Sequence, residues 1–547
     1  MATVLLGMAL GGTVCMLMLA LAIKAQRSVR LNSYQSLASY GRQMQLLQDK
    51  HDLARFGLSQ LLGRGGGGIW PMGLSFGTMA LLGSSVIVLG PALQQGGLSV
   101  IGYGLPLLGL FYVCVSGSLA ELSSAYPVAG SFYYAAKEMG GRRWGLRAGW
   151  FHAGGHLAML ALLIGGCAYA ADSSAAALWG YQTSGLTFGL FALAIAATQA
   201  AVHQYGAAWL KSIHAAGLWL QLAGALLLLA GLAWLFWPGG YSPALLYQLQ
   251  TIDFSGKVGM ESYLVGLLWL TKLFIGMDGA SQAAEEAMEP RVKVPWAIFL
   301  ATSYAFVIGF ALLTLVAIMA GPSGVIGAAG SALGWSSGST GMLSNIEVMM
   351  AGLWGSPVVL FIILVSLWGS GLQSLSVCAR TLLGLARENA APFASKLGLI
   401  SGNGKSPWAA GWIGAATAAA LLAGAHMASP GSALLPLLAF AIVALHTAYA
   451  IPIGLRFTSW GPFRRARLQR AGEESLVQSR WSSAPWQLGG WSPLVNGAAF
   501  LWLVVTSAAA VLLLEHAAAI GLAVLMLLAT VFELVSRRQS RPAPRGK

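Results

Sequence analysis

The sequence is poor in charged residues. Asp, Glu, Lys and Arg make up 9% of its 547 residues, whereas soluble globular domains usually carry about 25%. This shortage excludes an ordinary soluble fold. Cysteine is also scarce, and the four cysteines fall inside apolar runs without the spacing of a metal site or of a disulfide framework. We interpret them as small packing residues.

Several functional motifs are absent as well. The sequence has no glycine-rich P-loop, which argues against direct use of ATP. It has no histidine-rich metal box and no nucleophile–base arrangement, which disfavours a membrane-embedded enzyme. The charge rings and filter-like carbonyl repeats expected of a channel are missing too. Enzyme and channel are therefore the weaker function classes, and neither a cofactor nor a metal site is expected.

Long apolar runs fill most of the chain instead. Hydrophobic residues make up 57% of the sequence, and the mean hydropathy is +0.70. Runs of about 20 apolar residues match the bilayer core of roughly 30 Å that a membrane helix must cross. Hydropathy predicts twelve spans, at residues 69–94, 101–122, 145–172, 186–206, 212–237, 262–285, 295–320, 356–387, 408–426, 431–454, 490–515 and 517–536. The predicted fold class is therefore an all-α polytopic membrane protein.

The basic residues mark one side of the membrane. The formal net charge is +14, a value that would suggest nucleic acid as the partner of a soluble protein. If residue 69 starts on the cytoplasmic side, every Lys and Arg except Lys257 and Lys272 falls in or beside a cytoplasmic segment. The positive charge is therefore a topology signal, and no nucleic-acid partner is expected. This prediction places the long basic loops and the C-terminus in the cytoplasm, and it leaves open whether the plasma membrane or an organellar membrane holds the protein.

The N-terminal region is distinct from the main domain. Residues 1–24 contain an extra apolar stretch that no basic residue precedes, which does not fit a signal peptide. This stretch is either an additional membrane helix with an external N-terminus or a spurious extension. Residues 25–68 are predicted to form a cytoplasmic segment, residues 69–536 the twelve-helix domain, and residues 537–547 a basic cytoplasmic tail.

The spans can be divided into two sets of five, with the last two spans peripheral. Because five is odd, the second set begins on the opposite side of the membrane, which is the topology of an inverted repeat. The first helix of each such repeat is interrupted. Span one carries Gly83, Ser84 and Ser85 in mid-membrane, and span six carries Gly276 and Asp278. Glycine costs about 1 kcal/mol inside a helix and serine competes for backbone hydrogen bonds, so both helices are predicted to break there.

Three further motifs occur in order along the chain. AELSSAYPVAG begins at Ala120 and contains a Tyr-Pro step that ends a helix, EEAMEPRVKVP follows the break in span six, and SVCARTLLGLAR ends span eight. With the Gly-Gly pair at 96–97 and GMDGAS at 276–281, they resemble the amino acid–polyamine–organocation superfamily. Within it, the amino acid/choline and GABA permease branch is the most similar. The resemblance extends from about residue 52 to the end.

This resemblance implies alternating access around a site at the bilayer midplane, on a fold of two inverted five-helix repeats plus two peripheral helices. A substrate carboxylate would meet N–H groups at the first break, and the amine would meet carbonyls at both breaks, as the partial charges of helix ends favour. Carried over residue by residue, the binding positions are Gly83, Ser84 and Ser85 in span one and Phe274, Ile275, Gly276, Met277 and Asp278 in span six.

Lys272 departs from the family pattern, because many members place a gating aromatic four residues before Gly276. A lysine near mid-membrane costs about 2.5–3.5 kcal/mol on insertion scales, so it needs a partner or water. It either binds a substrate carboxylate, pairs with Asp278, replaces a cation at an ion site, or simply extends toward the membrane surface. Asp278 is either a proton-coupling or amine-binding group, or the cap of a broken helix end.

Two histidines on span three are candidates for lining the cavity. His152 and His156 lie one helical turn apart, a spacing that can bind metal. No carboxylate or cysteine accompanies them in the sequence, so metal is not expected. Cavity lining or contacts between helices are predicted instead, with sensitivity to pH.

Further lining candidates lie on spans eight and ten. Ser366, Ser370 and Gln373 recur at helical spacing, where they either face the site or hold helices together. His446 and Tyr449 are additional candidates on span ten.

The predicted function is secondary active transport of amino acids or of related amines such as GABA. A transport-inactive nutrient receptor or scaffold is the alternative, because a fold alone does not fix function. Coupling to protons, coupling to sodium and exchange all stay open, as does the oligomeric state. The expected partners are a small-molecule substrate and the lipid bilayer.

Overall fold

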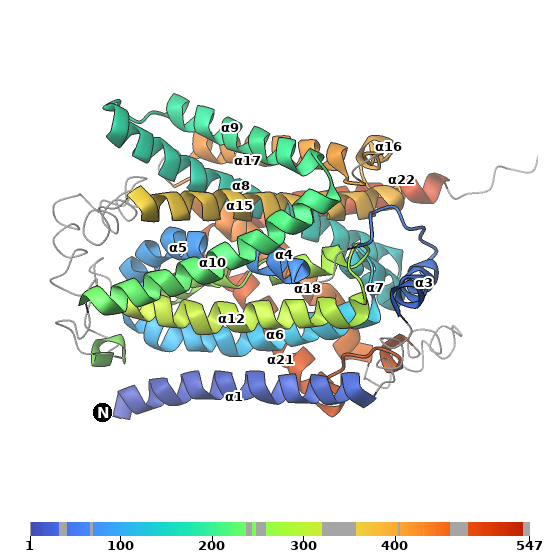
Figure 1. Ribbon diagram of the computed structural model, residues 1–547, viewed down its shortest axis with the longest axis horizontal. Helices are drawn as coiled ribbons and strands as arrows, with labels where there is room; N and C mark the ends of the chain where they lie inside the picture. The colour runs from blue at the N-terminus through green and yellow to red at the C-terminus, as the bar shows by residue number, and fades with distance from the viewer. Residues whose placement is uncertain are drawn as a thin grey trace, which may run out of the picture.

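The computed structural model describes residues 2–31, 41–65, 69–236, 243–247, 259–319, 357–402, 405–429, 432–459 and 480–539. Within these residues every regular element is a helix, and thirteen helices are long and apolar enough to cross a membrane. The long helices run roughly side by side along the longest axis of the molecule (Figure 1). The predicted class, an all-α polytopic membrane protein, is confirmed.

Each predicted span corresponds to a helix or to a set of consecutive helices. Spans two to five are η1 (Val100–Gly104) with α6 (Leu105–Ala125), α8 (Arg142–Trp179), α9 (Gly185–Gln204) and α10 (Ala207–Phe236). Spans seven to twelve are α12 (Pro290–Met319), α15 (Pro357–Arg387), α17 (Trp408–Ala428), α18 (Leu434–Ser459), α21 (Ser492–Ala509) with η6 (Ala510–Leu514), and α22 (Ala517–Gln539). The extra N-terminal stretch forms α1 (Ala2–Leu31), which packs along α6.

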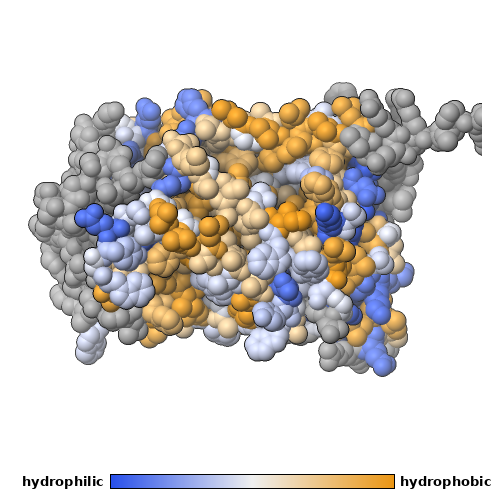
Figure 2. Space-filling view, turned by 90° about the horizontal axis from the view of Figure 1, so that it is seen from above, coloured by the Kyte–Doolittle hydropathy of each residue, from blue (hydrophilic) through white to orange (hydrophobic). Residues whose placement is uncertain are grey.

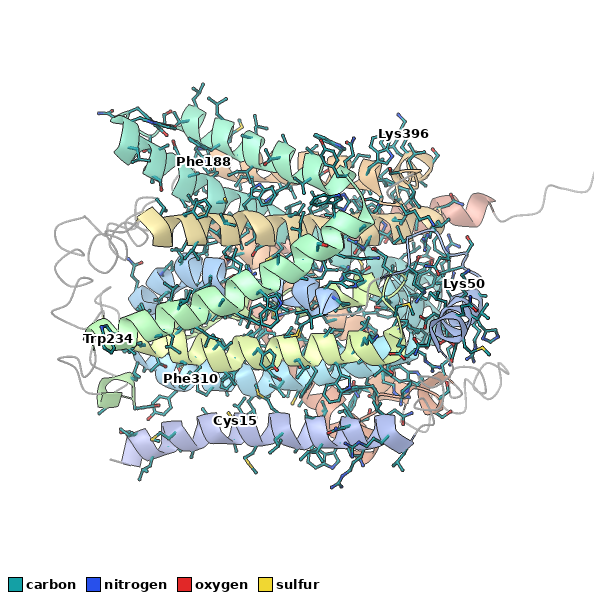
Figure 3. The ribbon with its side chains drawn as sticks, in the orientation of Figure 1. Cys15, Lys50, Phe188, Trp234, Phe310 and Lys396 are labelled. Carbon is teal, nitrogen blue, oxygen red and sulfur yellow. The ribbon has the colours of Figure 1, made fainter. Side chains whose placement is uncertain are left out.

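The two ends of the molecule differ from its middle. Apolar side chains predominate on the broad face in Figure 2, and strongly hydrophilic ones lie mostly toward its two ends, as expected for helices in a bilayer. Lys50 on α3 (Gly41–Ala54) and Lys396 on α16 (Ala394–Leu397) lie at one end, and Trp234 lies at the other (Figure 3). The end that holds the two lysines is the one predicted to be cytoplasmic. The basic loop at 460–479, Lys257 and the tail beyond 539 lie outside the described residues.

Span one is broken at Ala80. It consists of α4 (Trp70–Met79) and α5 (Leu81–Gly96), and Ala80 between them has left-handed backbone angles, with φ 57° and ψ 53°. The Ala80 N–H ends α4 by donating to the Phe76 carbonyl at 3.1 Å. The break is therefore real, but it precedes the glycine–serine cluster in which the sequence placed it.

The predicted break residues Gly83, Ser84 and Ser85 instead form the start of α5. The hydroxyls of both serines bond to carbonyls of the preceding turn. Ser84 Oγ donates to the Met79 carbonyl at 2.6 Å, and Ser85 Oγ donates to the Leu81 carbonyl at 2.6 Å. The serines therefore satisfy carbonyls near the break rather than unwinding at their own positions.

Span six is broken where the sequence predicts it. α11 (Met260–Leu270) tightens into the 3-10 turn η3 (Thr271–Leu273), and a second 3-10 helix, η4 (Met277–Ala283), begins after Gly276. Gly276 has a φ of 96°, a backbone conformation that favours glycine.

The two breaks lie against each other. α5 packs along α11, and α4 packs along η4, so the halves of the two broken helices are paired. The Thr78 hydroxyl lies 2.5 Å from the Gly276 carbonyl oxygen. A Cβ atom added to Gly276 would come within 3.0 Å of the Thr78 Cβ, so a side chain there would crowd this contact. This close meeting of two interrupted backbones forms the centre of the candidate site.

Candidate functional site

The Lys272 ammonium group connects the two breaks. Lys272 lies on η3 and is fully buried, and its Nζ donates to the Met79 carbonyl at 3.0 Å and to Ser84 Oγ at 2.8 Å. Among the residues that the structure describes, no carboxylate forms an ion pair with this lysine, and Asp278 pairs with histidines instead. Two neutral oxygens therefore hold a buried amino group that forms no ion pair with a carboxylate of the described residues.

The start of α5 supplies further donors near this ammonium. Leu81, Leu82 and Gly83 form the first turn of α5, so their N–H groups have no acceptor within the helix. No side chain caps this helix either. Open N–H groups at a helix start carry partial positive charge and favour anions. The predicted binding residues Gly83 and Ser84 therefore lie at a helix N-terminus that Lys272 also contacts.

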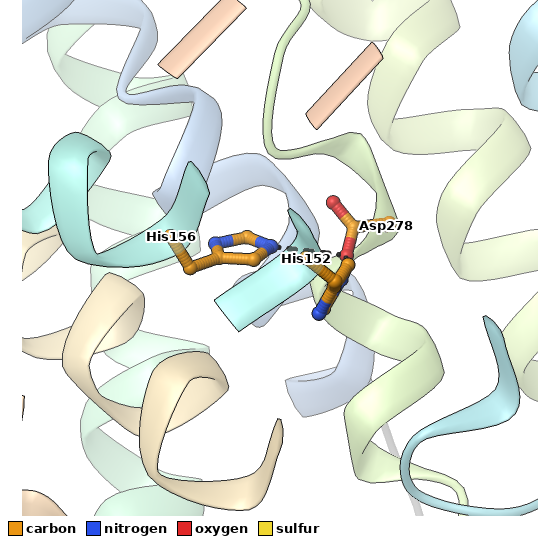
Figure 4. Close-up of side chains that lie close together, drawn as sticks. All are labelled: His152, His156 and Asp278. Carbon is orange, nitrogen blue, oxygen red and sulfur yellow. Dashed lines mark hydrogen bonds and ion pairs between the residues drawn. The ribbon is translucent and has the colours of Figure 1, made fainter. Parts of the chain in front are cut away.

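Asp278 is the centre of a second buried cluster (Figure 4). Its Oδ2 atom lies 2.5 Å from His152 Nε2 and 3.1 Å from His156 Nε2, and the Tyr449 hydroxyl donates to Oδ1. The histidines lie on α8 and the tyrosine on α18, which packs along α8. All four side chains are at most 1% exposed. The structure thus brings both histidines predicted from span three onto the carboxylate of span six.

The far sides of the two histidine rings differ. His152 Nδ1 lies 3.0 Å from Thr381 Oγ1, and the Thr381 hydroxyl donates to the Val377 carbonyl at 3.0 Å. His156 Nδ1 has no hydrogen-bond partner among the described residues. Phe132 packs on the His152 ring, with the ring centroids 4.8 Å apart. His152 is therefore hydrogen-bonded through both ring nitrogens, whereas His156 is hydrogen-bonded through Nε2 and has its ring centroid 4.5 Å from that of His152.

Two histidines and a carboxylate are also a donor set that transition metals accept. The three candidate ligand atoms of this cluster lie within 4.8 Å of one another. However, both Nε2 atoms approach the same oxygen of Asp278 at hydrogen-bond distances. The structure therefore assigns these atoms to hydrogen bonds. The expectation that the chain carries no metal stays a prediction.

Of the candidates from span eight, Ser370 and Gln373 contact α10, and Gln373 also lies against Gly77 of α4. Ser370 Oγ accepts from Gln221 Nε2 at 3.3 Å, and Gln373 Nε2 donates to the His214 carbonyl at 3.5 Å. Ser366 is buried, and its hydroxyl has no partner among the described residues. Both roles left open for Ser370 and Gln373 therefore stay predictions.

Sequence reasoning did not identify Tyr112 or Thr381 as parts of the site. Tyr112 stacks on Phe274, with ring centroids 4.9 Å apart, and its hydroxyl lies 2.8 Å from His446 Nε2. Neither residue belongs to a motif of recognised chemistry. For Thr381, the sequence offered only its position directly after Arg380, in the segment that ends span eight.

A group of ion pairs joins span six to α15 and α10 near the end of the molecule that is predicted to be cytoplasmic. Arg387 Nη1 lies 2.5 Å from Glu285 Oε1, and Arg380 Nε lies 2.7 Å from Glu286 Oε1. Lys211 Nζ lies 3.7 Å from the other Glu286 oxygen. The acidic pair that follows η4 is thus bound to α15 and α10, which fixes this half of span six against its neighbours.

Comparison with known proteins identifies the family to which this arrangement belongs. The sequence matches the family described as amino acid permease over residues 72–532. Amino-acid permease 2 of Neurospora crassa is 25% identical over 434 residues, covering 75% of this chain and 72% of the relative. Amino-acid permease BAT1 of Arabidopsis thaliana is 24% identical over 461 residues, covering 79% and 82%. Since the family match runs from the first broken helix to the last span, the chain belongs to the amino acid permease family of the amino acid–polyamine–organocation superfamily.

Proposed function

We propose that the protein is a secondary transporter that binds an amino acid between the two breaks and carries it across the membrane by alternating access. The family and the names of its relatives support amino acid transport. The observation that carries the proposed site is Lys272, a buried amino group held by two neutral oxygens. A substrate carboxylate supplies the negative charge that this site lacks.

The donors around Lys272 fit a carboxylate. An ammonium group has three N–H donors, and two of them bond to Met79 and Ser84, which leaves one for a ligand. The first-turn N–H groups of α5 add neutral donors from the same direction. On this arrangement the substrate amine binds carbonyls at Phe274 and Ile275, where span six is unwound.

This site predicts which compounds are carried. Choline and polyamines lack a carboxylate, so they leave the Lys272 charge unbalanced and are expected to be poor substrates. GABA has both a carboxylate and an amine and stays among the candidates. A hydrogen bond to a charged group contributes about 1.5–3 kcal/mol, and so loss of the Lys272 contact should weaken binding about 10- to 150-fold.

Alternating access gives this group of ion pairs a role as well. Glu285 and Glu286 hold the end of span six to α15 and α10. A pathway on this side opens only when these pairs separate. On this proposal they keep the site closed to the cytoplasm until the substrate has bound.

Uptake by purified protein in liposomes tests the proposal. Labelled amino acids, GABA, choline and polyamines would be screened for saturable uptake by the wild type, by Lys272→Met and by Lys396→Met. Lys272→Met keeps the length of the side chain but removes its charge, whereas Lys396 is exposed and serves as the matched control. The expected result is a rise in KM of at least about tenfold for Lys272→Met alone.

Two outcomes would contradict this proposal at different levels. An unchanged KM in Lys272→Met would remove the carboxylate site but leave the transporter. Folded wild-type protein that carries none of the compounds, with or without ion gradients, would remove the transporter itself.

A further inference from the structure

Residues 41–65 lie at the end of the molecule that is predicted to be cytoplasmic. They consist of α3 and of the turns and coil at residues 55–65, and we call them the strap. α3 is found at the end of the helix bundle that also carries Lys396 (Figure 1, Figure 3). The match to the amino acid permease family begins at residue 72. The strap therefore lies outside the matched family region.

The strap donates to three consecutive carbonyls of span six. Residues 285, 286 and 287 follow η4 in turns and bends. Their carbonyl oxygens accept, in that order, from Gln60 Nε2 at 2.9 Å, from the Gly65 N–H at 3.2 Å and from Arg64 Nη1 at 2.7 Å. The strap thus supplies partners for backbone oxygens that lie beyond the end of a helix.

The same stretch of the strap is bonded to α10. Lys211 Nζ on α10 donates to the Gly63 carbonyl at 2.7 Å and to the Gly65 carbonyl at 3.1 Å. Gly65 therefore bonds to span six through its N–H and to α10 through its carbonyl. Because the strap bridges these two elements, they cannot move apart while all of these bonds persist.

A buried ion pair joins α3 to the rest of the strap and to the start of α12. Arg64 Nη1 lies 3.1 Å from Asp49 Oδ2, and the two side chains are 4% and 1% exposed. The same carboxylate oxygen accepts from the Glu289 N–H at 3.2 Å, and Gln45 Nε2 donates to Glu289 Oε1 at 3.0 Å. Arg64 thus holds α3 and span six with one side chain.

The strap is packed as well as hydrogen-bonded. Leu53 is 2% exposed and Leu62 is 1% exposed. The centroids of the Phe56 and Tyr126 rings lie 5.9 Å apart, and the Arg480 guanidinium carbon lies 4.0 Å from the centroid of the Phe56 ring. Detachment of the strap would therefore expose side chains that are buried in the structure.

We propose that the strap is autoinhibitory and must detach before the transporter opens at this end. The inference rests on the proposed alternating access, in which a pathway here opens when span six separates from α10. The bonds of Arg64 and Gly65 oppose that separation, so they stabilise the closed state only. A contact made in one of two states shifts the equilibrium toward that state. Weakening the strap should therefore raise the open fraction and the rate of transport.

Labelling of a buried cysteine measures detachment of the strap. The full-length protein carries Leu62→Cys, which places a thiol on the buried side of the strap, and Cys15→Ser, which removes the exposed native cysteine. The other three native cysteines are buried. A polyethylene glycol maleimide is too bulky to reach the thiol while the strap is docked. The labelling rate of the purified protein is then proportional to the detached fraction.

The variants weaken the strap to different extents. Asp49→Asn combined with Arg64→Met removes the buried pair without leaving one charge unpaired. Loss of the charged bond from Arg64 to the carbonyl of residue 287 should raise the labelling rate about 10- to 150-fold. Gln60→Ala removes a neutral donor and should raise the rate about two- to tenfold. Lys50→Met, on the exposed side of α3, is the matched control and should leave the rate unchanged.

Exchange of labelled for unlabelled amino acid in liposomes measures transport by the same variants, made without Leu62→Cys. The substrate is the compound found in the uptake screen, at a saturating concentration. The double variant Asp49→Asn/Arg64→Met should exchange it at least about twofold faster than wild type, because detachment precedes each opening. Lys50→Met should exchange it at the wild-type rate.

The outcomes separate this inference from the proposed function. Labelling that is no faster in the double variant and in Gln60→Ala than in Lys50→Met would overturn detachment of the strap. Faster labelling with an unchanged or lower exchange rate would overturn autoinhibition. Both results would leave the transporter in place, whereas folded wild-type protein that exchanges no substrate would overturn the proposed function as well.

Discussion

Removing the carboxylate of Glu286 should destabilise the protein by several kcal/mol. Arg380 Nε lies 2.7 Å from Glu286 Oε1, and both side chains are only 1% exposed. Lys211 Nζ lies 3.7 Å from the other carboxylate oxygen. Removing one partner of a buried ion pair costs about 3–5 kcal/mol because a charge is left uncompensated. Glu286→Gln leaves two cations without their carboxylate, so we expect the upper part of this range.

The assay is the free energy of unfolding, measured by titration with a denaturing detergent and followed by tryptophan fluorescence. Lys293→Met is the matched control, because Lys293 pairs with Glu289 one turn away and its side chain is 39% exposed. Such pairs contribute about 0.3–0.5 kcal/mol. The double variant Glu286→Gln/Arg380→Met should recover part of the loss, because it removes a buried charge that lacks a partner. Equal losses in Glu286→Gln and Lys293→Met would refute the reasoning.

Three further predictions concern the breaks and their surroundings. Gly276→Ala should lower the thermal stability and slow uptake, since a φ of 96° costs a side chain about 1–3 kcal/mol; unchanged stability would mean that this turn is not held. Tyr449→Phe should lower the free energy of unfolding by about 1.5–3 kcal/mol, because Asp278 loses a donor. An equal free energy of unfolding in wild type and variant would mean that this hydrogen bond does not stabilise the protein. Burial, opposed by Arg64, raises the pKa of Asp49 from 3.8 to about 6. The Asp49 carboxyl therefore binds a proton more tightly when α3 is docked than when the segment is free. Docking of α3 should be strongest below about pH 4, and its free energy should weaken by about 3 kcal/mol as the pH rises through 6. Hydrogen exchange at residues 41–54, corrected for intrinsic rates, measures how strongly α3 is docked. Protection that does not change with pH would contradict this prediction.

The helices were predictable from the sequence because each membrane span is a local property of about 20 residues. The break at Gly276 was predictable as well, since its positive φ favours glycine. The break in span one was placed too late. Ala80 gives no sequence signal for a left-handed backbone, and Lys272 and Thr78 make contacts across the breaks that the local sequence does not contain.

The partners within the site were harder to predict. The spacing of His152 and His156 correctly indicated that they share one helix face, but the sequence showed no carboxylate near them. The carboxylate is Asp278, which lies 122 residues beyond His156. Tyr449 lies a further 171 residues beyond Asp278. Which faces of spans three, six and ten meet depends on the packing of all the helices, and a single sequence does not record it.

Span six carries two buried charges whose partners lie on different helices. Lys272 is bonded to the first break, on the side of α5, whereas Asp278 is bonded to α8 and α18. A continuous helix would force both charges to move together. The turn that ends in left-handed Gly276 separates them, so their contacts lie on different halves of span six.

This separation determines which contacts open together. The hydrogen-bonded carboxylate of Asp278 and the ion pairs of Glu285 and Glu286 all lie on the half of span six that begins with η4. Under the proposed alternating access, a movement of that half toward an open cytoplasmic pathway would break both sets of contacts in one step. On that proposal the contacts of Asp278 and the ion pairs are expected to open together.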